Sequence, residues 1–167
     1  RGGGTFGGLG RGVERVASCD VRYVGSADNK TKYTDFRRVL ERGDIDVVAI
    51  ATPPHWHALI SIAAMQAGKD VPCEKPLPRF IAEGRAVVEA QNRYGRILQV
   101  GTFGRFSASR ASSKIRIHKI MRSGLLKDQC KGVHIKNGGL KVKQWSGYVN
   151  PKPQAVPDWL DWDMYCG

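Results

Sequence analysis

The segment that most constrains the fold runs from Val47 to Leu77, with the sequence VVAIATPPHWHALISIAAMQAGKDVPCEKPL. It opens with a short apolar run, Val47 to Ala51, which is typical of a strand buried on both faces of a parallel sheet. Two consecutive prolines end that strand, because proline lacks a backbone donor and disfavours helix in the residue before it. A helix is then predicted over residues 55–66 and a second strand over 70–73. This order predicts an α/β protein.

The flanking segments continue the same alternation of strands and helices. Strands are predicted over residues 16–19 and 97–100, and helices over 35–42 and 80–94. A further helix is predicted over 113–123. In open α/β sheets ligands bind outside the carboxyl ends of the strands, so the residues that follow each strand are the candidate site residues.

The chain begins with a glycine-rich stretch, GGGTFGGLGRG, which covers residues 2–12 and has seven glycines in eleven positions. It contains the spacing G-x-G-x-x-G and a second register of glycines, at Gly8, Gly10 and Gly12. One interpretation is a dinucleotide phosphate loop, in which glycines let the backbone approach the pyrophosphate above a helix N-terminus. The other is a disordered leader, since the motif requires a preceding strand and only Arg1 stands there.

The net charge of +12 is unevenly distributed along the chain. Residues 101–150 hold eleven Lys or Arg and one acid, Asp128, which gives this tract a net +10. A nucleic-acid-binding tract is one interpretation, and a solvated helix and loop facing an acidic region or an anionic ligand is the other. The tract lacks interleaved aromatic residues of the kind that stack on bases, which disfavours nucleic acid.

Other classes of site and partner are disfavoured by spacing and hydropathy. No apolar run approaches the roughly 20 residues that span a bilayer. The four cysteines lie far apart, which is typical of reduced structural thiols. His55 and His57 are two residues apart, so they point in different directions on a helix, and no metal site is predicted.

Several motifs together resemble those of the glucose–fructose oxidoreductase, inositol dehydrogenase and rhizopine-catabolism family (Gfo/Idh/MocA). The motifs are ATPPHWH at 51–57, AGKDVPCEKPL at 67–77, AEGRAVVEAQNRYGRILQVG at 82–101, and LDWDMYCG at 160–167. The resemblance implies a Rossmann-like, doubly wound parallel sheet, with its first strand missing, as an NAD(P)-binding domain over residues 1–105. It implies that residues 106–167 begin an α+β substrate and oligomerisation domain.

The resemblance also implies the site. Lys75 would be the catalytic residue, because a cation near a substrate hydroxyl favours loss of the hydroxyl proton during hydride transfer; a solvated lysine is the alternative. Asp20, at the end of the second strand, is placed to bind the adenosine ribose and favours NAD over NADP, with a capping carboxylate as the alternative. The complete set of predicted cofactor contacts is Gly8, Gly10, Asp20, Thr52, Pro53, His57, Glu74, Lys75 and Gln99.

The expected function is that of a fragment of an NAD(P)-dependent oxidoreductase that transfers a hydride between nicotinamide and a sugar, polyol or related carbohydrate. Family members have a strand before the glycine loop and continue well past residue 167, so both ends are expected to be missing and little turnover is expected of this chain alone. A non-catalytic nucleotide-binding relative and a basic nucleic-acid-binding module are the alternatives. The whole protein is expected to be a homo-oligomer, either cytoplasmic or exported, with no membrane partner.

Overall fold

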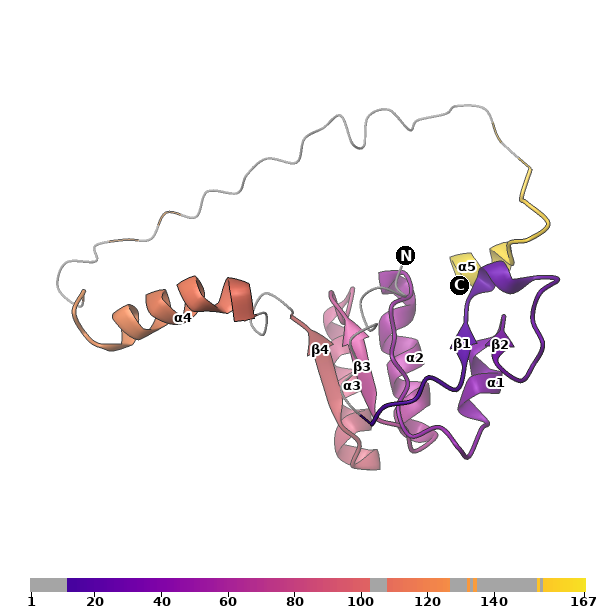
Figure 1. Cartoon of the computed structure of the whole chain (residues 1–167), viewed down its shortest axis with the longest axis horizontal. Helices are drawn as coiled ribbons and strands as arrows, with labels where there is room; N and C mark the ends of the chain where they lie inside the picture. The colour runs from indigo at the N-terminus through magenta and orange to yellow at the C-terminus, as the bar shows by residue number, and fades with distance from the viewer. Residues whose placement is uncertain (1–11, 103–107, 127–131, 133, 135–152, 154) are drawn as a thin grey trace. The chain divides into compact units, whose positions relative to one another are not determined.

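The structure is a computed structural model that describes residues 12–102, 108–126, 132, 134, 153 and 155–167 (Figure 1). The chain divides into two compact units. The first comprises Arg1–Thr102 together with Val156–Gly167, and the second comprises Phe103–Ala155. The predicted domain boundary at residue 105 stays a prediction.

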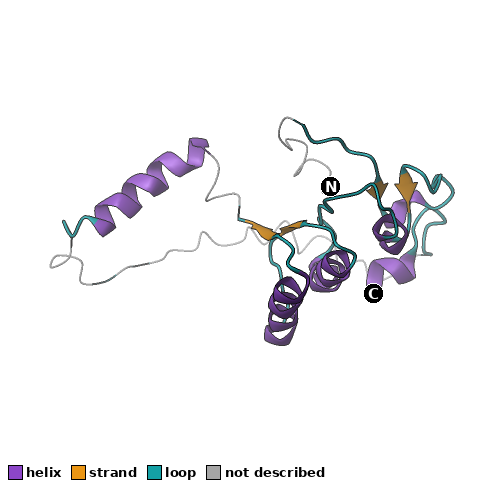
Figure 2. Cartoon of the chain, turned by 90° about the horizontal axis from the view of Figure 1, so that it is seen from below, coloured by secondary structure: helices purple, strands orange, loops and turns teal. Residues whose placement is uncertain are grey.

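The larger sheet of the first unit pairs β3 (Val71–Glu74) with β4 (Leu98–Gly101) in parallel. Two helices, α2 (Pro54–Gln66) and α3 (Ile81–Tyr94), pack against each other and lie on the same face of this sheet (Figure 2). All four elements fall within one or two residues of their predicted positions. The βαβ arrangement predicted from the order of apolar runs is therefore confirmed.

The predicted strand at residues 47–51 is present only as two isolated parallel bridges to the β3 region, Val47 with Asp70 and Ile50 with Cys73. Ile50 is 2% exposed, as a buried strand requires, but Val47 is 49% exposed. The prediction of burial on both faces is therefore wrong for this segment. The gap between the two bridges falls at Pro72, which has no N–H to donate to the Val48 carbonyl, whereas Val48 and Ile50 donate to the carbonyls of Asp70 and Pro72.

Local sequence explains where both helices begin and end. Pro54 occupies the first turn of α2, where its fixed φ suits a helix and its missing N–H is not needed. The Glu83 carboxylate accepts hydrogen bonds from the backbone N–H groups of Arg79 and Phe80 and so closes the start of α3. Gly95, with φ of 60°, ends α3 in the left-handed conformation that glycine adopts without strain.

The smaller sheet pairs β1 (Ser18–Cys19) with β2 (Lys32–Tyr33), also in parallel. The short helices η2 (Val21–Tyr23) and α1 (Phe36–Leu40) follow these strands. The stretch that ends in β2, residues 24–33, holds no apolar run of the kind that predicts a strand. Its last residue, Tyr33, is 5% exposed in a small apolar cluster, so burial of one side chain decides the pairing.

Among the described residues, no strand joins the two sheets. The strand order of the doubly wound fold is 3-2-1-4-5-6. The pairing within each sheet agrees with this order if β1 and β2 are strands 2 and 3 of the fold, and residues 47–50, β3 and β4 are strands 4, 5 and 6. The facing edges are those of β1 and of residues 47–50.

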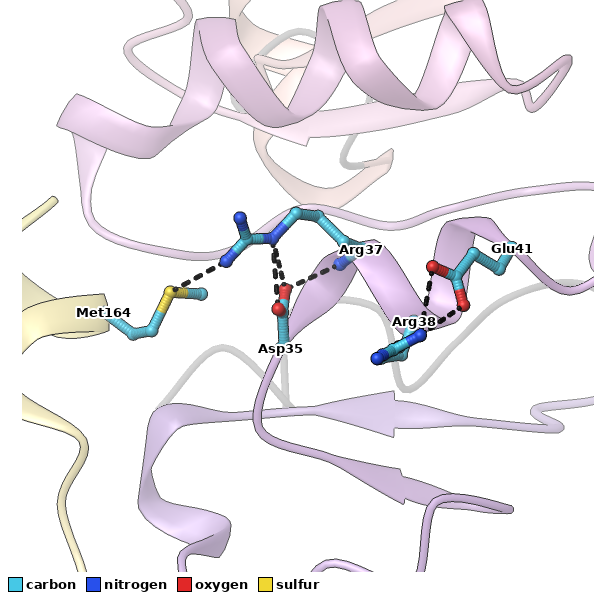
Figure 3. Close-up of polar contacts among 5 residues, drawn as sticks. All are labelled: Asp35, Arg37, Arg38, Glu41 and Met164. Atoms are coloured by element: carbon cyan, nitrogen blue, oxygen red, sulfur yellow. Dashed lines mark hydrogen bonds and ion pairs between the residues drawn. The ribbon is translucent and has the colours of Figure 1, made fainter.

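The end of the chain returns to the first unit as α5 (Trp162–Cys166). The Asp161 backbone N–H donates to the Val21 carbonyl over 2.9 Å. The Arg37 guanidinium pairs with Asp35 and also reaches the Met164 sulfur at 3.7 Å (Figure 3). Asp35 also caps α1 by accepting from the Arg37 backbone N–H.

The described part of the second unit is mainly α4 (Ala108–Arg122), which begins five residues earlier than predicted. Gly124, with φ of 77°, follows it. Between α4 and α5 the structure describes residues 123–126, 132, 134, 153 and 155–161. None of the helices described here is long and apolar enough to cross a membrane.

Candidate functional site

The carboxyl ends of two parallel segments bring the predicted site residues to one edge of the larger sheet. The Glu74 backbone N–H donates to the Ile50 carbonyl over 2.9 Å, so the end of β3 lies beside the end of the 47–50 segment. Thr52 and Pro53 follow one segment, and Glu74 and Lys75 follow the other. Two predicted groups that are more than 20 positions apart in the sequence are therefore neighbours at the edge where α/β folds bind ligands.

Lys75 presents a free ammonium group at this edge. The side chain is exposed, and within the described ranges its Nζ has no hydrogen bond or ion-pair partner. The neighbouring Glu74 carboxylate accepts from the Lys75 backbone N–H over 3.1 Å instead of pairing with the ammonium. The Lys75–Pro76 peptide bond is cis. The lysine is thus available to a bound molecule.

Thr52 carries a polar atom without a partner. Its Oγ1 is buried and makes no hydrogen bond. Buried hydroxyl groups are nearly always hydrogen-bonded. Among the described residues Ser61 Oγ, within α2, is a second buried hydroxyl without a partner, so such an atom does not by itself mark a ligand site. The predicted cofactor contact at Thr52 stays a prediction.

His57 is buried beneath the same edge, at 1% exposure. Its Nδ1 lies 2.7 Å from the Pro76 carbonyl oxygen, and its Nε2 lies 2.8 Å from the Thr52 carbonyl oxygen. The ring therefore joins the two loops that carry Thr52 and Lys75. Its predicted direct contact with the cofactor stays a prediction.

Asp20 follows β1 and is held by Arg22. The guanidinium donates to both carboxylate oxygens, with the shortest contact at 2.6 Å, and the Arg22 backbone N–H donates to one of them over 3.0 Å. These hydrogen bonds, led by those from the Arg22 side chain, hold the pKa of Asp20 below its usual range. Both interpretations of Asp20 fit this geometry. The carboxylate caps η2, and it also has further lone pairs that could accept a hydrogen bond from a ribose hydroxyl.

The other predicted contacts are distributed differently. Gln99 is an exposed residue within β4, two positions before the strand ends. Gly8 and Gly10 lie outside the described residues, so the glycine-rich loop stays a prediction.

The sequence reasoning did not place α5 at this edge. Nε2 of His55 lies 2.9 Å from the Tyr165 carbonyl oxygen. The rings of Trp162 and Tyr165 stack on each other, with their centroids 5.5 Å apart. The helix therefore extends from the residue after Asp20 to the start of α2. The motif LDWDMYCG was the only sequence signal for this segment, and it gave no position.

No group of three or more His, Cys, Asp or Glu side chains comes together as a metal site within the described ranges. Cys19, Cys73 and Cys166 are free thiols. The chemistry at the edge is instead a cation, carboxylates and an unpartnered hydroxyl, which fits a polar organic ligand such as a dinucleotide.

Parallel strands joined by helices, with polar residues at the carboxyl edge, are features of Rossmann-type dinucleotide-binding domains. Comparison with known proteins agrees: the family described as oxidoreductase family, NAD-binding Rossmann fold (Gfo/Idh/MocA) matches residues 11–102, more than half of the chain. The chain belongs to this family, as its motifs predicted.

Relatives of this chain include dehydrogenases of polyols and sugar derivatives. Inositol 2-dehydrogenase of Salmonella typhimurium is 32% identical over 68% of this chain and 35% of its own length. Levoglucosan dehydrogenase of Pseudarthrobacter phenanthrenivorans is 51% identical over 34% of this chain and 15% of its own length. The crystal structure of myo-inositol 2-dehydrogenase from Lactobacillus plantarum has a TM-score of 0.60 at 26% identity, covering 73% of this chain and 37% of that one. The chain thus spans about a third or less of the length of these relatives.

Proposed function

We propose that this chain is the cofactor-binding part of an NAD-dependent oxidoreductase that transfers a hydride between nicotinamide and a hydroxyl-bearing carbon of a sugar, polyol or related carbohydrate. The observation that carries the proposal is the position of Lys75, whose ammonium has no partner among the described residues: it follows β3 at the same carboxyl edge at which Thr52 follows the 47–50 segment. Relatives named as inositol and levoglucosan dehydrogenases support the substrate class.

In this proposal different residues contact the two ends of the dinucleotide. Thr52, Pro53 and Glu74 line the nicotinamide side with Lys75, while Asp20 accepts hydrogen bonds from the adenosine ribose. An ionised Asp20 would repel a 2′-phosphate, and Arg22 is engaged by that same carboxylate, so NAD is favoured over NADP. The glycines at positions 8 and 10 are proposed to approach the pyrophosphate.

Bound nicotinamide would accept or supply the hydride. Removing a hydride from a carbinol carbon requires that its hydroxyl lose a proton, and negative charge then develops on that oxygen. The Lys75 ammonium would stabilise this charge and hold the substrate oxygen by hydrogen bonding. Because Lys75 has no partner among the described residues, it need not break an ion pair in order to do so.

The test is a fluorescence titration of the 167-residue chain with NADH, for the wild type and for Lys75→Met. Methionine keeps most of the length and the apolar stem but removes the charge. We expect saturable binding that weakens about tenfold in the variant, since a hydrogen bond to a charged group is worth about 1.5–3 kcal/mol. Lys119→Met, an exposed lysine on α4, is the matched control and should bind as the wild type does.

A second measurement examines turnover. NAD reduction is followed at saturating cofactor with myo-inositol, levoglucosan and aldoses as probe substrates, for this chain and for a version extended at both ends with the corresponding segments of a relative. Saturable binding with turnover only in the extended version is the expected result. Absence of NADH binding in both versions contradicts the proposed function.

A further inference from the structure

His57 has an environment that a neutral imidazole does not satisfy. Both ring nitrogens lie within hydrogen-bond distance of backbone carbonyl oxygens, Nδ1 at 2.7 Å from Pro76 and Nε2 at 2.8 Å from Thr52. A carbonyl oxygen only accepts, so each contact is a hydrogen bond only if that nitrogen carries a proton. The neutral ring has one N–H, and its other nitrogen would direct a lone pair at a carbonyl oxygen.

The two carbonyl groups belong to the two loops that form the site. Thr52 follows the 47–50 segment, and Pro76 follows Lys75 directly. His57 itself is in the first turn of α2, at 1% exposure, so water does not compete for its ring protons. The ring is therefore a link between loops that come from different strands.

We propose that His57 is a positioning residue: its doubly protonated ring donates to the Thr52 and Pro76 carbonyls at once and so holds Lys75 in register with the Thr52 loop. The positioning of a cofactor ligand by this ring rests on the proposed function, whereas the two hydrogen bonds do not. Loss of either hydrogen bond loosens one loop relative to the other.

The charged groups near α2 do not provide the ring with another partner. The titratable and charged groups on α2 and on the elements packed against it are these: His55 on α2; Cys73 and Glu74 in β3, with Lys75 after it; Glu83, Arg85, Glu89, Arg93 and Tyr94 on α3, with Arg79 before it; Arg37 and Arg38 on α1, with Asp35 and Glu41 beside it; and Asp163, Tyr165 and Cys166 on α5, with Asp161 before it. Within the described ranges none of these forms an ion pair with His57, and Glu74, Glu83 and Asp35 accept from nearby N–H groups.

The first experiment uses NMR to determine which ring nitrogens of His57 carry a proton, in the full 167-residue chain labelled with ¹⁵N. Long-range ¹H–¹⁵N spectra distinguish a protonated from an unprotonated imidazole nitrogen, and are recorded from about pH 6 to about pH 8, where histidines change charge. We expect two protonated ring nitrogens for His57 at about pH 6. A ring with a single protonated nitrogen there overturns the proposal. Exposed His118 on α4 provides the reference for an unconstrained ring.

The second experiment follows the backbone amide signals of the two loops that carry Thr52 and Lys75. His57→Gln keeps a single side-chain amide donor group and a similar volume, so at most one link is expected to survive. We expect the backbone amide signals of Thr52, Lys75 and Leu77 to move together in this variant, while His118→Gln leaves them in place. Unmoved Lys75 and Leu77 signals in a folded His57→Gln chain contradict a positioning role. If that variant does not fold, the wild-type ring spectra still decide whether both hydrogen bonds exist.

The third experiment separates this inference from the proposed function. NADH dissociation constants are measured at about pH 6 for the wild type and for His57→Gln. We expect about tenfold weaker binding in the variant. Equal affinity in the two chains overturns the positioning role. If neither the wild type nor the version extended at both ends binds NADH, the proposed function fails, and the spectra of the ring and loops alone decide on His57.

Discussion

Replacement of Asp20 separates its structural role from its proposed binding role. Asp20→Ala removes the side chain that caps η2 and the ion pair with Arg22, whereas Asp20→Asn keeps a capping oxygen and removes the charge. A lost cap costs about 1 kcal/mol. The ion pair adds less than about 1 kcal/mol, because Arg22 is 56% exposed. The free energy of unfolding should therefore fall by about 1–2 kcal/mol in the alanine variant and by less than about 1 kcal/mol in the asparagine variant.

Cofactor affinity should respond differently from stability. A ribose hydroxyl that donates to an ionised carboxylate contributes about 1.5–3 kcal/mol, so both variants should bind NADH about 10- to 100-fold more weakly. NADPH should lose less affinity, because the repulsion of its 2′-phosphate disappears and Arg22 is released to pair with it. The assays are urea unfolding followed by circular dichroism, and fluorescence titration with both dinucleotides. A folded Asp20→Asn chain that binds NADH as tightly as the wild type would refute the ribose role.

The same residue has a predicted pH signature. Arg22 lowers the pKa of Asp20 in the folded chain below its value in the unfolded chain. The resulting stabilisation is fully present above the unfolded pKa, about 3.9, and is lost as the pH falls through the folded pKa. The difference in unfolding free energy between the wild type and Asp20→Asn should therefore shrink below about pH 4. A difference that is constant from neutral to strongly acidic pH would contradict this assignment.

Two further predictions concern the core of the first unit. Met65 is 0% exposed, so Met65→Ala should lower the free energy of unfolding by about 2–5 kcal/mol in urea titrations. Met121 is 49% exposed, so the control Met121→Ala should change that free energy by less than about 0.5 kcal/mol. Equal effects of the two substitutions would contradict the assigned core. Burial raises the pKa of the Cys73 thiol to about 11, so a disulfide reagent should label Cys73 only after denaturation while exposed Cys166 reacts in the folded chain. Rapid native labelling of Cys73, read by mass spectrometry, would contradict its burial.

Much of the larger sheet and its helices could be predicted because the relevant signals are local. Proline in the first turn starts α2, a glycine in the left-handed conformation ends α3, and the apolar runs between them have the period of a strand or a helix. The positions of Thr52 and Lys75 at the ends of parallel segments follow from that order alone. The family followed from the motifs at the same positions, and the match over residues 11–102 confirms it.

The tertiary structure decided what depends on contacts between distant residues. The two partners of His57 lie 5 and 19 positions away, and α5 contacts η2 and α2 from the far end of the chain. Periodicity carries no information about such contacts, since it reports which face of an element is apolar and not what covers it. Burial of Tyr33 selected β2, and Val47 is half exposed because it lies on the opposite face of its segment from buried Ile50. The sequence by itself thus determined the order of elements and the residues at the carboxyl edge, while packing determined which of their polar atoms are paired and which remain free.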